Sequence, residues 1–166
     1  MVEIVPITAA HIESFHRTLD FVARERRYLS FVQAPPLEST RAFILNNIEQ
    51  GYPQFVALSA GEVVGWCDVT PKSGPIDARI GVLGMGLMPQ FRQQGIGTRM
   101  MVAALEAARR TGFSRVELTV YRGNTDAIRL YQKAGFLLKA VQPREAGNDG
   151  SDKTLLVMAL ALDGAR

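Results

Sequence analysis

The sequence has little of what secreted or membrane proteins need. Its 166 residues include one cysteine, Cys67, so no disulfide can form within the chain and we expect a reducing compartment. The first residues, MVEIVPIT, lack the basic segment and apolar run of a secretory signal. The most apolar helical stretch, MMVAALEAA, is short and carries Glu106, which does not suit a membrane span. We therefore predict a cytoplasmic protein without a membrane partner.

Charge and metal-binding residues are also sparse. The net charge of +3 suits a small anionic ligand better than a nucleic acid, because no basic stripe is present. Arg24, Arg26 and Arg27 come closest to a basic cluster, but Glu25 interrupts them and we interpret them as a solvated helix end. Two histidines and one cysteine, scattered along the chain, predict no metal site.

Apolar spacing predicts alternating strands and helices in one domain spanning residues 1–166, with no repeats. The order is that of a mixed α/β or α+β sheet covered by helices. The glycines in the strand at 79–88 suggest a bulge or a close backbone approach. Strands are expected at 2–7, 54–59, 63–70, 79–88, 115–121, 136–142 and 154–162, and helices after Thr8, from Ser39 or Thr40 to 50, at 95–110 and at 125–134.

The stretch LMPQFRQQGIGTRMM, residues 87–101, changes from a strand pattern to a helix pattern through glycines. The first N–H groups of a helix have no internal partner, and the helix dipole favours negative charge there. Gly95 and Gly97 carry no side chains, so an anion can approach the backbone. The turn is therefore either an anion-binding site or a plain glycine-rich loop.

Two common phosphate-binding motifs do not fit this turn. A P-loop needs lysine after its second glycine, whereas Gly97 is followed by Thr98 and Arg99. The dinucleotide motif needs a third glycine, but Gly84-Met85-Gly86-Leu87-Met88 is followed by Pro89. Both motifs are excluded.

Residues 92–97, RQQGIG, resemble the R/Q-x-x-G-x-G/A signature of the GCN5-related N-acetyltransferases (GNAT family). Residues 81–86 have the same glycine spacing, but they lack a leading Arg or Gln and continue into strand. A second segment, VELTVYRGNTDAIRLYQKAGF at 116–136, resembles the later part of the same family's fold. The resemblance extends from about Gln54 to Phe136.

The resemblance implies a mixed sheet of about seven strands, splayed between the fourth and fifth strands and flanked by about four helices. It also implies acetyl-CoA as the acyl donor, with the pantetheine arm paired to the exposed edge of the fourth strand. Lys133 or Arg129 is expected near the 3′-phosphate. The expected donor-binding residues are Met85, Gly86, Leu87, Met88, Arg92, Gln93, Gln94, Gly95, Ile96, Gly97, Thr98, Asn124, Tyr131 and Lys133.

By the same resemblance, the acetyl group passes directly to a primary amine in a ternary complex. The N–H of Leu87 or a neighbour is expected to stabilise the oxyanion, and the Tyr131 hydroxyl to protonate the leaving thiolate. Glu117 is a candidate general base, acting directly or through water, and Asp68 is another; for each, a surface position or a structural pair is the alternative role. Cys67 is not expected to be a nucleophile, because its strand has no histidine partner.

The acceptor stays open between an amino acid, a polyamine, an antibiotic, a protein N-terminus and a lysine side chain. An amine with a pKa of about 8 is favoured over one near 10.4, because no obvious strong base is present. The first two helices and the segment YLSFVQAPPLE, with Tyr28 and Phe31, are expected to form the acceptor wall. A homodimer is possible, and a non-catalytic acyl-CoA-binding module is the alternative function.

Overall fold

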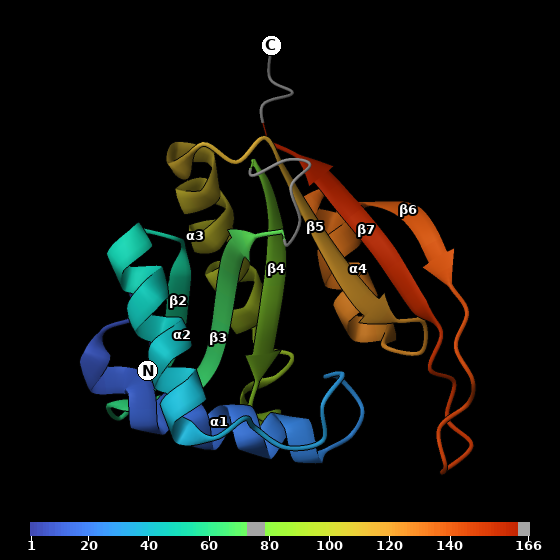
Figure 1. The fold of residues 1–166 in the computed structure, drawn as a ribbon, viewed down its shortest axis with the longest axis horizontal. Coiled ribbons are helices and arrows are strands. Elements are labelled where there is room, and N and C mark those ends of the chain that lie inside the picture. Colours follow the sequence, from blue (N-terminus) through green and yellow to red (C-terminus); the bar gives the residue numbers. More distant parts are fainter. Residues whose placement is uncertain (73–78, 163–166) are drawn as a thin grey trace.

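The computed structural model describes residues 1–72 and 79–162, and these form one seven-stranded mixed sheet with four α-helices (Figure 1). Along the sheet the strands lie in the order β1-β2-β3-β4-β5-β7-β6. The strands are β1 (Val2–Pro6), β2 (Gln54–Ser59), β3 (Glu62–Pro71), β4 (Ile80–Leu87), β5 (Arg115–Tyr121), β6 (Leu137–Gln142) and β7 (Leu155–Ala161), and the helices are α1 (Ile12–Arg24), α2 (Leu37–Gln50), α3 (Ile96–Thr111) and α4 (Thr125–Ala134). The predicted fold is confirmed.

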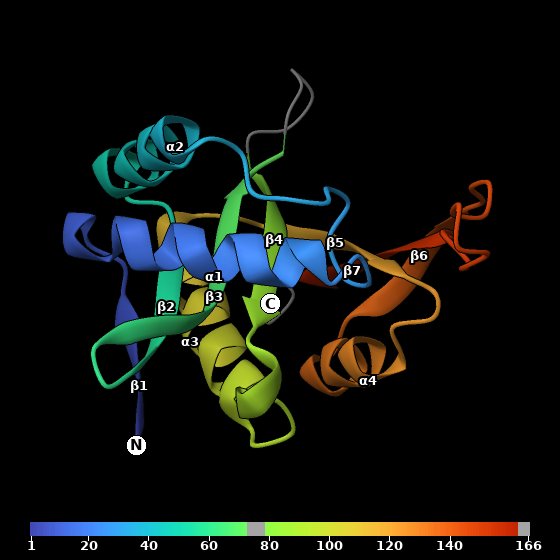
Figure 2. The same ribbon diagram turned by 90° about the horizontal axis from the view of Figure 1, so that it is seen from below.

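The helices cover both faces of the sheet (Figure 2). Helices α1 and α2 bury Phe15 and Ile44 against Trp66 of the sheet in one core. Helices α3 and α4 bury residues such as Met101 and Tyr131 in a second core on the other face. No helix in the described ranges is long and apolar enough to cross a membrane. Each face of the sheet is therefore covered by a separate hydrophobic core.

Element boundaries differ from the sequence prediction at two helix starts. Helix α2 begins at Leu37, directly after Pro36, and not at Ser39 or Thr40. A proline fits immediately before a helix because its fixed φ suits that position, so Pro36 marks the start of α2. The prolines do not end the previous helix, since α1 already stops at Arg24. After Thr8, a 3₁₀ turn (Ala9–His11) precedes α1, and the Thr8 N–H donates to Nδ1 of His11.

Strands β4 and β5 pair for only part of their length. Their parallel register joins Ile80 to Arg115, Gly81 to Val116 and Val82 to Glu117, and no later residues pair. Beyond Val82, β4 stays bonded to β3, from Leu83 opposite Val69 to Leu87 opposite Gly65. Strand β5 instead stays bonded to β7 as far as Tyr121. The sheet is thus splayed from Leu83 onward, and the two halves diverge in Figure 1.

The glycines of β4 leave space for side chains of β3. A Cβ built on Gly86 would overlap the indole ring of Trp66, and one on Gly84 would lie 3.3 Å from Oδ1 of Asp68. Both β3 side chains therefore lean over β4 on the face covered by α1 and α2. This explains the unusual glycine content of a strand interior.

We predict that Gly86→Ala destabilises the fold by about 1–3 kcal/mol, because the Trp66 ring must move to admit the methyl group. Gly123→Ala is the matched control: no atom lies within 4 Å of a Cβ built there. Urea unfolding of both variants measures the difference. Equal midpoints for Gly86→Ala and the wild type would show that the ring does not occupy this space.

Candidate active site

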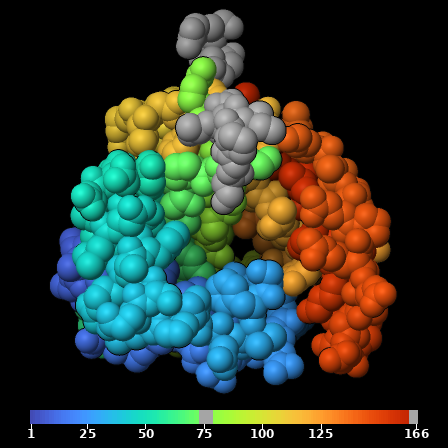
Figure 3. Space-filling view, in the orientation of Figure 1, coloured from blue at the N-terminus to red at the C-terminus, as the bar shows by residue number. Residues whose placement is uncertain are grey.

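The splay opens into a cleft of about 1310 Å³ between the two halves of the sheet. It is visible as a hollow between α1, β4 and the β5–β7 half in Figure 3. Of the predicted site residues, Glu117, Met88, Gln94 and Ile96 do not line the cleft. The predicted residues that do line it are Met85, Gly86, Leu87, Arg92, Gln93, Gly95, Gly97, Thr98, Asn124, Tyr131 and Lys133.

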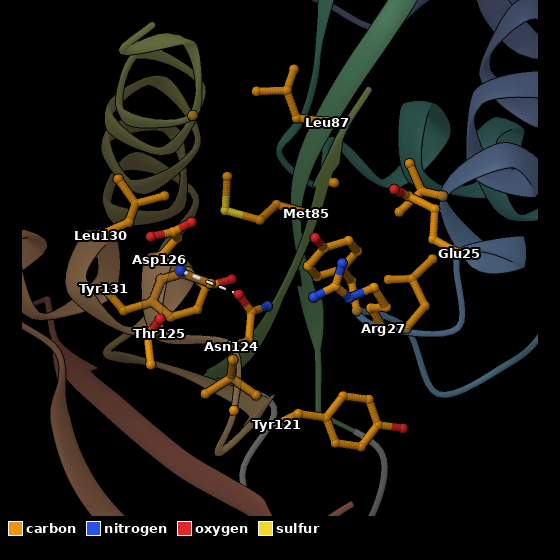
Figure 4. Close-up of a pocket in the computed structure, with 18 of the residues that line it drawn as sticks. Glu25, Arg27, Met85, Leu87, Tyr121, Asn124, Thr125, Asp126, Leu130 and Tyr131 are labelled. Carbon is orange, nitrogen blue, oxygen red and sulfur yellow. Dashed lines mark hydrogen bonds between the residues drawn. The ribbon is translucent and has the colours of Figure 1, made fainter. Parts of the chain in front are cut away.

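The open edge of β4 presents the backbone groups of alternate residues to the cleft. The Met88 N–H donates to the Val64 carbonyl of β3 at 2.8 Å. Since backbone groups alternate in direction along a strand, the Leu87 N–H points to the opposite edge, where β5 no longer pairs. Met85 shares this orientation; in Figure 4 it lies near the centre, with Leu87 above it on the same strand. Leu87 and Met85 thus offer hydrogen-bonding groups to an extended ligand.

The glycine turn leaves a run of backbone donors free. Within the described residues, none of the N–H groups from Gln93 to Thr98 donates a hydrogen bond; the first that does is Arg99, to the Gly95 carbonyl at 3.1 Å. Gln93 and Gly95 have positive φ angles of 62° and 79°. This backbone, at the start of α3, adds the positive end of a helix dipole to the free donors, an arrangement that suits a pyrophosphate.

Gly97 has a packing role that its sequence position does not reveal. A Cβ at Gly97 would lie 3.3 Å from Cδ2 of Leu130 on α4 and 3.5 Å from Cε of Met85. Its small size therefore allows α3 to approach both α4 and β4. The sequence suggested only that the glycine lets a phosphate reach the backbone.

Arg92 connects the glycine turn to the end of α1. Its guanidinium donates to both carboxylate oxygens of Glu25, at 2.7 and 3.2 Å, and its Nε donates to the Leu87 carbonyl at 2.8 Å. It also lies 4.5 Å from the centre of the Tyr28 ring. The charge that we expected beside the pyrophosphate is thus balanced by Glu25, a residue that sequence reasoning missed.

Helix α4 supplies the polar groups on one wall of the cleft (Figure 4). Asn124 caps this helix, because its Oδ1 accepts from the Ala127 N–H at 3.4 Å. The Tyr131 hydroxyl has no hydrogen-bond partner among the described residues. Burial, with a smaller effect of Cys67, raises the pKa of Tyr131 further above its ordinary value. The hydroxyl therefore keeps its proton at neutral pH and remains a donor.

Two cations of α4 also line the cleft. Arg129 is paired with Asp126 at 3.8 Å, both on the exposed face of the helix. Lys133 has no ion pair in the part of the chain that the structure describes. Of the two residues expected near the 3′-phosphate, Lys133 is therefore the one whose charge is available.

Glu117 lies at the closed end of the splay, outside the cleft. It is buried, and its carboxylate accepts from Lys72 at 2.8 Å and Lys139 at 2.6 Å, with Arg115 at 3.0 Å. Burial alone would raise the pKa of Glu117, but the hydrogen bonds from the two lysines outweigh it and lower the pKa to about 2. Its role as general base stays a prediction, and these contacts favour a structural role.

Asp68 has the opposite environment. It is 7 % exposed, on β3 directly opposite Gly84, and no hydrogen bond or ion pair reaches its carboxyl from the described residues. Burial raises the pKa of Asp68 to about 7. The carboxyl can therefore exchange a proton near neutral pH, which Glu117 cannot do.

We predict that Asp68→Asn stabilises the protein at pH 8 but not at pH 4. The pKa is raised from 3.8 unfolded to about 7 folded, so stability falls as pH rises through this window. Above it, the cost of ionising the buried group is of order 4 kcal/mol. Thermal melts of wild type and variant at both pH values measure the difference. If the difference in melting temperature between wild type and variant is the same at pH 4 and pH 8, the raised pKa of Asp68 is contradicted.

An open strand edge beside a cluster of free N–H groups at a helix start is suited to an extended, phosphorylated ligand. The acetyltransferase (GNAT) family model matches residues 19–136. The chain therefore belongs to the acetyltransferase (GNAT) family.

Curated relatives carry acetyltransferase names. A mycothiol acetyltransferase of Thermobispora bispora is 38% identical over 85 residues, covering 49% of this chain and 29% of that protein. An L-amino acid N-acetyltransferase of Escherichia coli is 27% identical, covering 60% of this chain and 62% of its own. An N-alpha-acetyltransferase of Sulfurisphaera tokodaii is 34% identical, over 64% of this chain and 68% of its own. The chain spans from 24% to 53% of the first three relatives it matches.

Solved structures share the fold at low identity. A GNAT acetyltransferase of Streptococcus pneumoniae has a TM-score of 0.88 at 22% identity, covering 97% of this chain and 99% of that one. A phosphinothricin acetyltransferase of Sinorhizobium meliloti, solved with acetyl-CoA, has a TM-score of 0.88 at 18% identity, covering 97% and 88%. These likenesses concern the fold.

Proposed function

We propose that this protein is an acetyl-CoA-dependent N-acetyltransferase that acts on a primary amine by direct transfer. The observation that carries the proposal is the unpaired edge of β4 next to the free N–H groups from Gln93 to Thr98. The pantetheine arm pairs with Met85 and Leu87 as an added strand would, and the pyrophosphate lies on the start of α3. Lys133 meets the 3′-phosphate.

In the proposed reaction, the amine attacks the acetyl carbonyl while the Leu87 N–H donates to the oxygen that gains negative charge. The C–S bond then breaks and the thiolate receives a proton through the Tyr131 hydroxyl. This hydroxyl is suited to the role because it is protonated, lines the cleft and has no partner in the described ranges.

We predict that Tyr131→Phe lowers kcat about 10²–10⁴-fold, because the leaving thiolate loses its proton donor. The dissociation constant of coenzyme A should change little, since the ring stays in the core beside Phe136. Thiol release across a panel of amines, together with calorimetric binding of coenzyme A, measures both quantities. The panel holds L-amino acids and their amides, a peptide N-terminus, a polyamine and phosphinothricin.

The same assay separates the enzyme from a non-catalytic acyl-CoA-binding module. Binding of acetyl-CoA without thiol release from any amine of the panel would favour the module. Turnover that is unaffected by Tyr131→Phe would leave the enzyme in place but remove Tyr131 as the acid.

We propose further that the acceptor carries a carboxylate beside its amine, as a free amino acid does. Arg27 lines the cleft from the α1 side, opposite Tyr131 (Figure 4). The centre of the Tyr28 ring is 6.0 Å from the Arg27 guanidinium, and no described residue forms an ion pair or hydrogen bond with Arg27. The names of the E. coli and S. tokodaii relatives, which concern L-amino acids and N-alpha groups, support the same class.

We predict that Arg27→Gln raises KM for free L-amino acids about 10–100-fold, the range expected for losing a hydrogen bond to a charged group. The KM for the matching amino acid amides should not change, since they lack the carboxylate. Initial rates at saturating acetyl-CoA measure both. An equal effect on acids and amides would remove Arg27 as the carboxylate-binding residue.

A further inference from the structure

Asp68 is a buried carboxyl that receives no hydrogen bond or ion pair from the described residues, so packing of the fold alone gives no reason for it. It faces α1 and α2, on the side of the sheet away from the glycine turn and α4. This side follows from its position beside Gly84. A Cβ on Gly84 would lie 3.3 Å from Oδ1 of Asp68, while Met85, the next residue, approaches Gly97 on the other face. Asp68 does not itself line the cleft, but its carboxyl lies beside Gly84, a residue of the cleft wall that has no side chain to cover it.

A second polar group next to Asp68 also lacks a partner. Gln54 of β2 is directly opposite Asp68 in the register and is 4 % exposed. Its Oε1 accepts from Nδ2 of Asn47 at 2.9 Å, whereas its Nε2 has no partner in the described residues. A free donor amide beside a free acceptor carboxyl is costly in a protein interior unless it serves a ligand or water. The free amide of Gln54 is therefore suited to stabilising the ionised form of the Asp68 carboxyl.

Among the described residues, the buried side chains that α1 and α2 contribute to this face of the sheet carry no charge. On the same side of the sheet, α1 and α2 present apolar or neutral buried side chains: Phe15, Thr18, Leu19 and Val22 from α1, and Thr40, Ile44 and Asn47 from α2. Helix α3 packs on the other face with buried Met and Ala residues. Cys67, the neighbouring buried thiol, is neutral because burial and Asp68 raise its pKa. Glu117 pairs with Val82 at the closed end of the splay, and its negative charge is already balanced by Lys72, Arg115 and Lys139.

We propose that Asp68 is the group that accepts the proton of the acceptor ammonium, directly or across one water, with Gln54 as a positioning residue. This inference rests on the proposed acetyl transfer. The carboxylate takes one proton from R–NH₃⁺, and the resulting amine forms the C–N bond. The C–S bond breaks, a second nitrogen proton replaces the one that Tyr131 gives to the thiolate, and Asp68 releases its proton to solvent. The products are the amide, free coenzyme A thiol and one proton.

The first arm of the test compares Asp68→Asn with the wild type in thiol release, using the most active amine of the panel. We expect kcat/KM for the amine at pH 7 to fall about 10²-fold or more, and the ionisation on the acidic limb of the pH profile to disappear. The KM for acetyl-CoA should stay within about twofold, since no donor-binding residue changes. Glu62→Gln, the same change at an exposed position of β3, should leave rate and pH profile unaltered.

The second arm does not need turnover. The Asp68 carboxyl is followed by ¹³C NMR from pH 4 to 9 in the coenzyme A complex of the full chain, with and without ethylamine. We expect the bound ammonium to lower the midpoint by about one pH unit, as a nearby opposite charge does. Gln54→Leu should raise the midpoint because the ionised carboxyl loses a neighbouring amide donor. An Asp68 that does not meet the amine would not respond to ethylamine.

The outcomes separate the two proposals. An unchanged rate and acidic limb in Asp68→Asn, or a midpoint insensitive to ethylamine, overturns the role of Asp68 while acetyl transfer stands. If no amine of the panel gives thiol release from the wild type, the proposed function fails, and the NMR titration still decides whether Asp68 meets the ammonium.

Discussion

The end of β4–β5 pairing at Val82 and Glu117 is the constraint on which the site depends. A parallel pair that continued to Leu87 would satisfy the edge of β4 and leave no room for an added ligand strand. The closed end is held by the Glu117 cluster, whose cations come from β5, from Lys72 at the end of β3 and from Lys139 on β6. Because this cluster joins both halves of the sheet, the splay begins at a defined point.

The splay also gives the two faces of β4 different tasks. On the α3–α4 face, Met85 packs near Gly97, and the free N–H groups of the glycine turn form the proposed donor site. On the α1–α2 face, Gly84 and Gly86 have no side chains, so Asp68 and Trp66 of β3 lie over the strand. Donor and acceptor can thus meet at the backbone of β4 from opposite sides, as direct transfer requires.

The order and type of elements were predictable because they depend on short-range patterns. Asn124 caps α4 and Gly95 begins α3 with a positive φ, and both features follow from the residue types at those positions. The contact between Glu25 and Arg92 joins residues far apart in the sequence, and no local pattern marks it. The three cations around Glu117 come from β5, from β6 and from Lys72 directly after β3. Its sequence position on β5 suggested a base, whereas these contacts favour a structural role.

Glu117 and Asp68 show why residue type alone does not identify a base. Both carboxyls are buried, which by itself raises the pKa of each. Hydrogen bonds from Lys139 and Lys72 hold Glu117 ionised with a pKa of about 2, so a proton taken from an amine would be lost again at once. Asp68 has no partner cation among the described residues, and burial raises its pKa to about 7, so the group is unstable as a buried anion. An approaching ammonium supplies the missing cation, and transfer of its proton then removes both charges from the interior. The same lack of partners that makes Asp68 costly to the fold therefore makes it suited to accept a proton at the moment when the amine arrives.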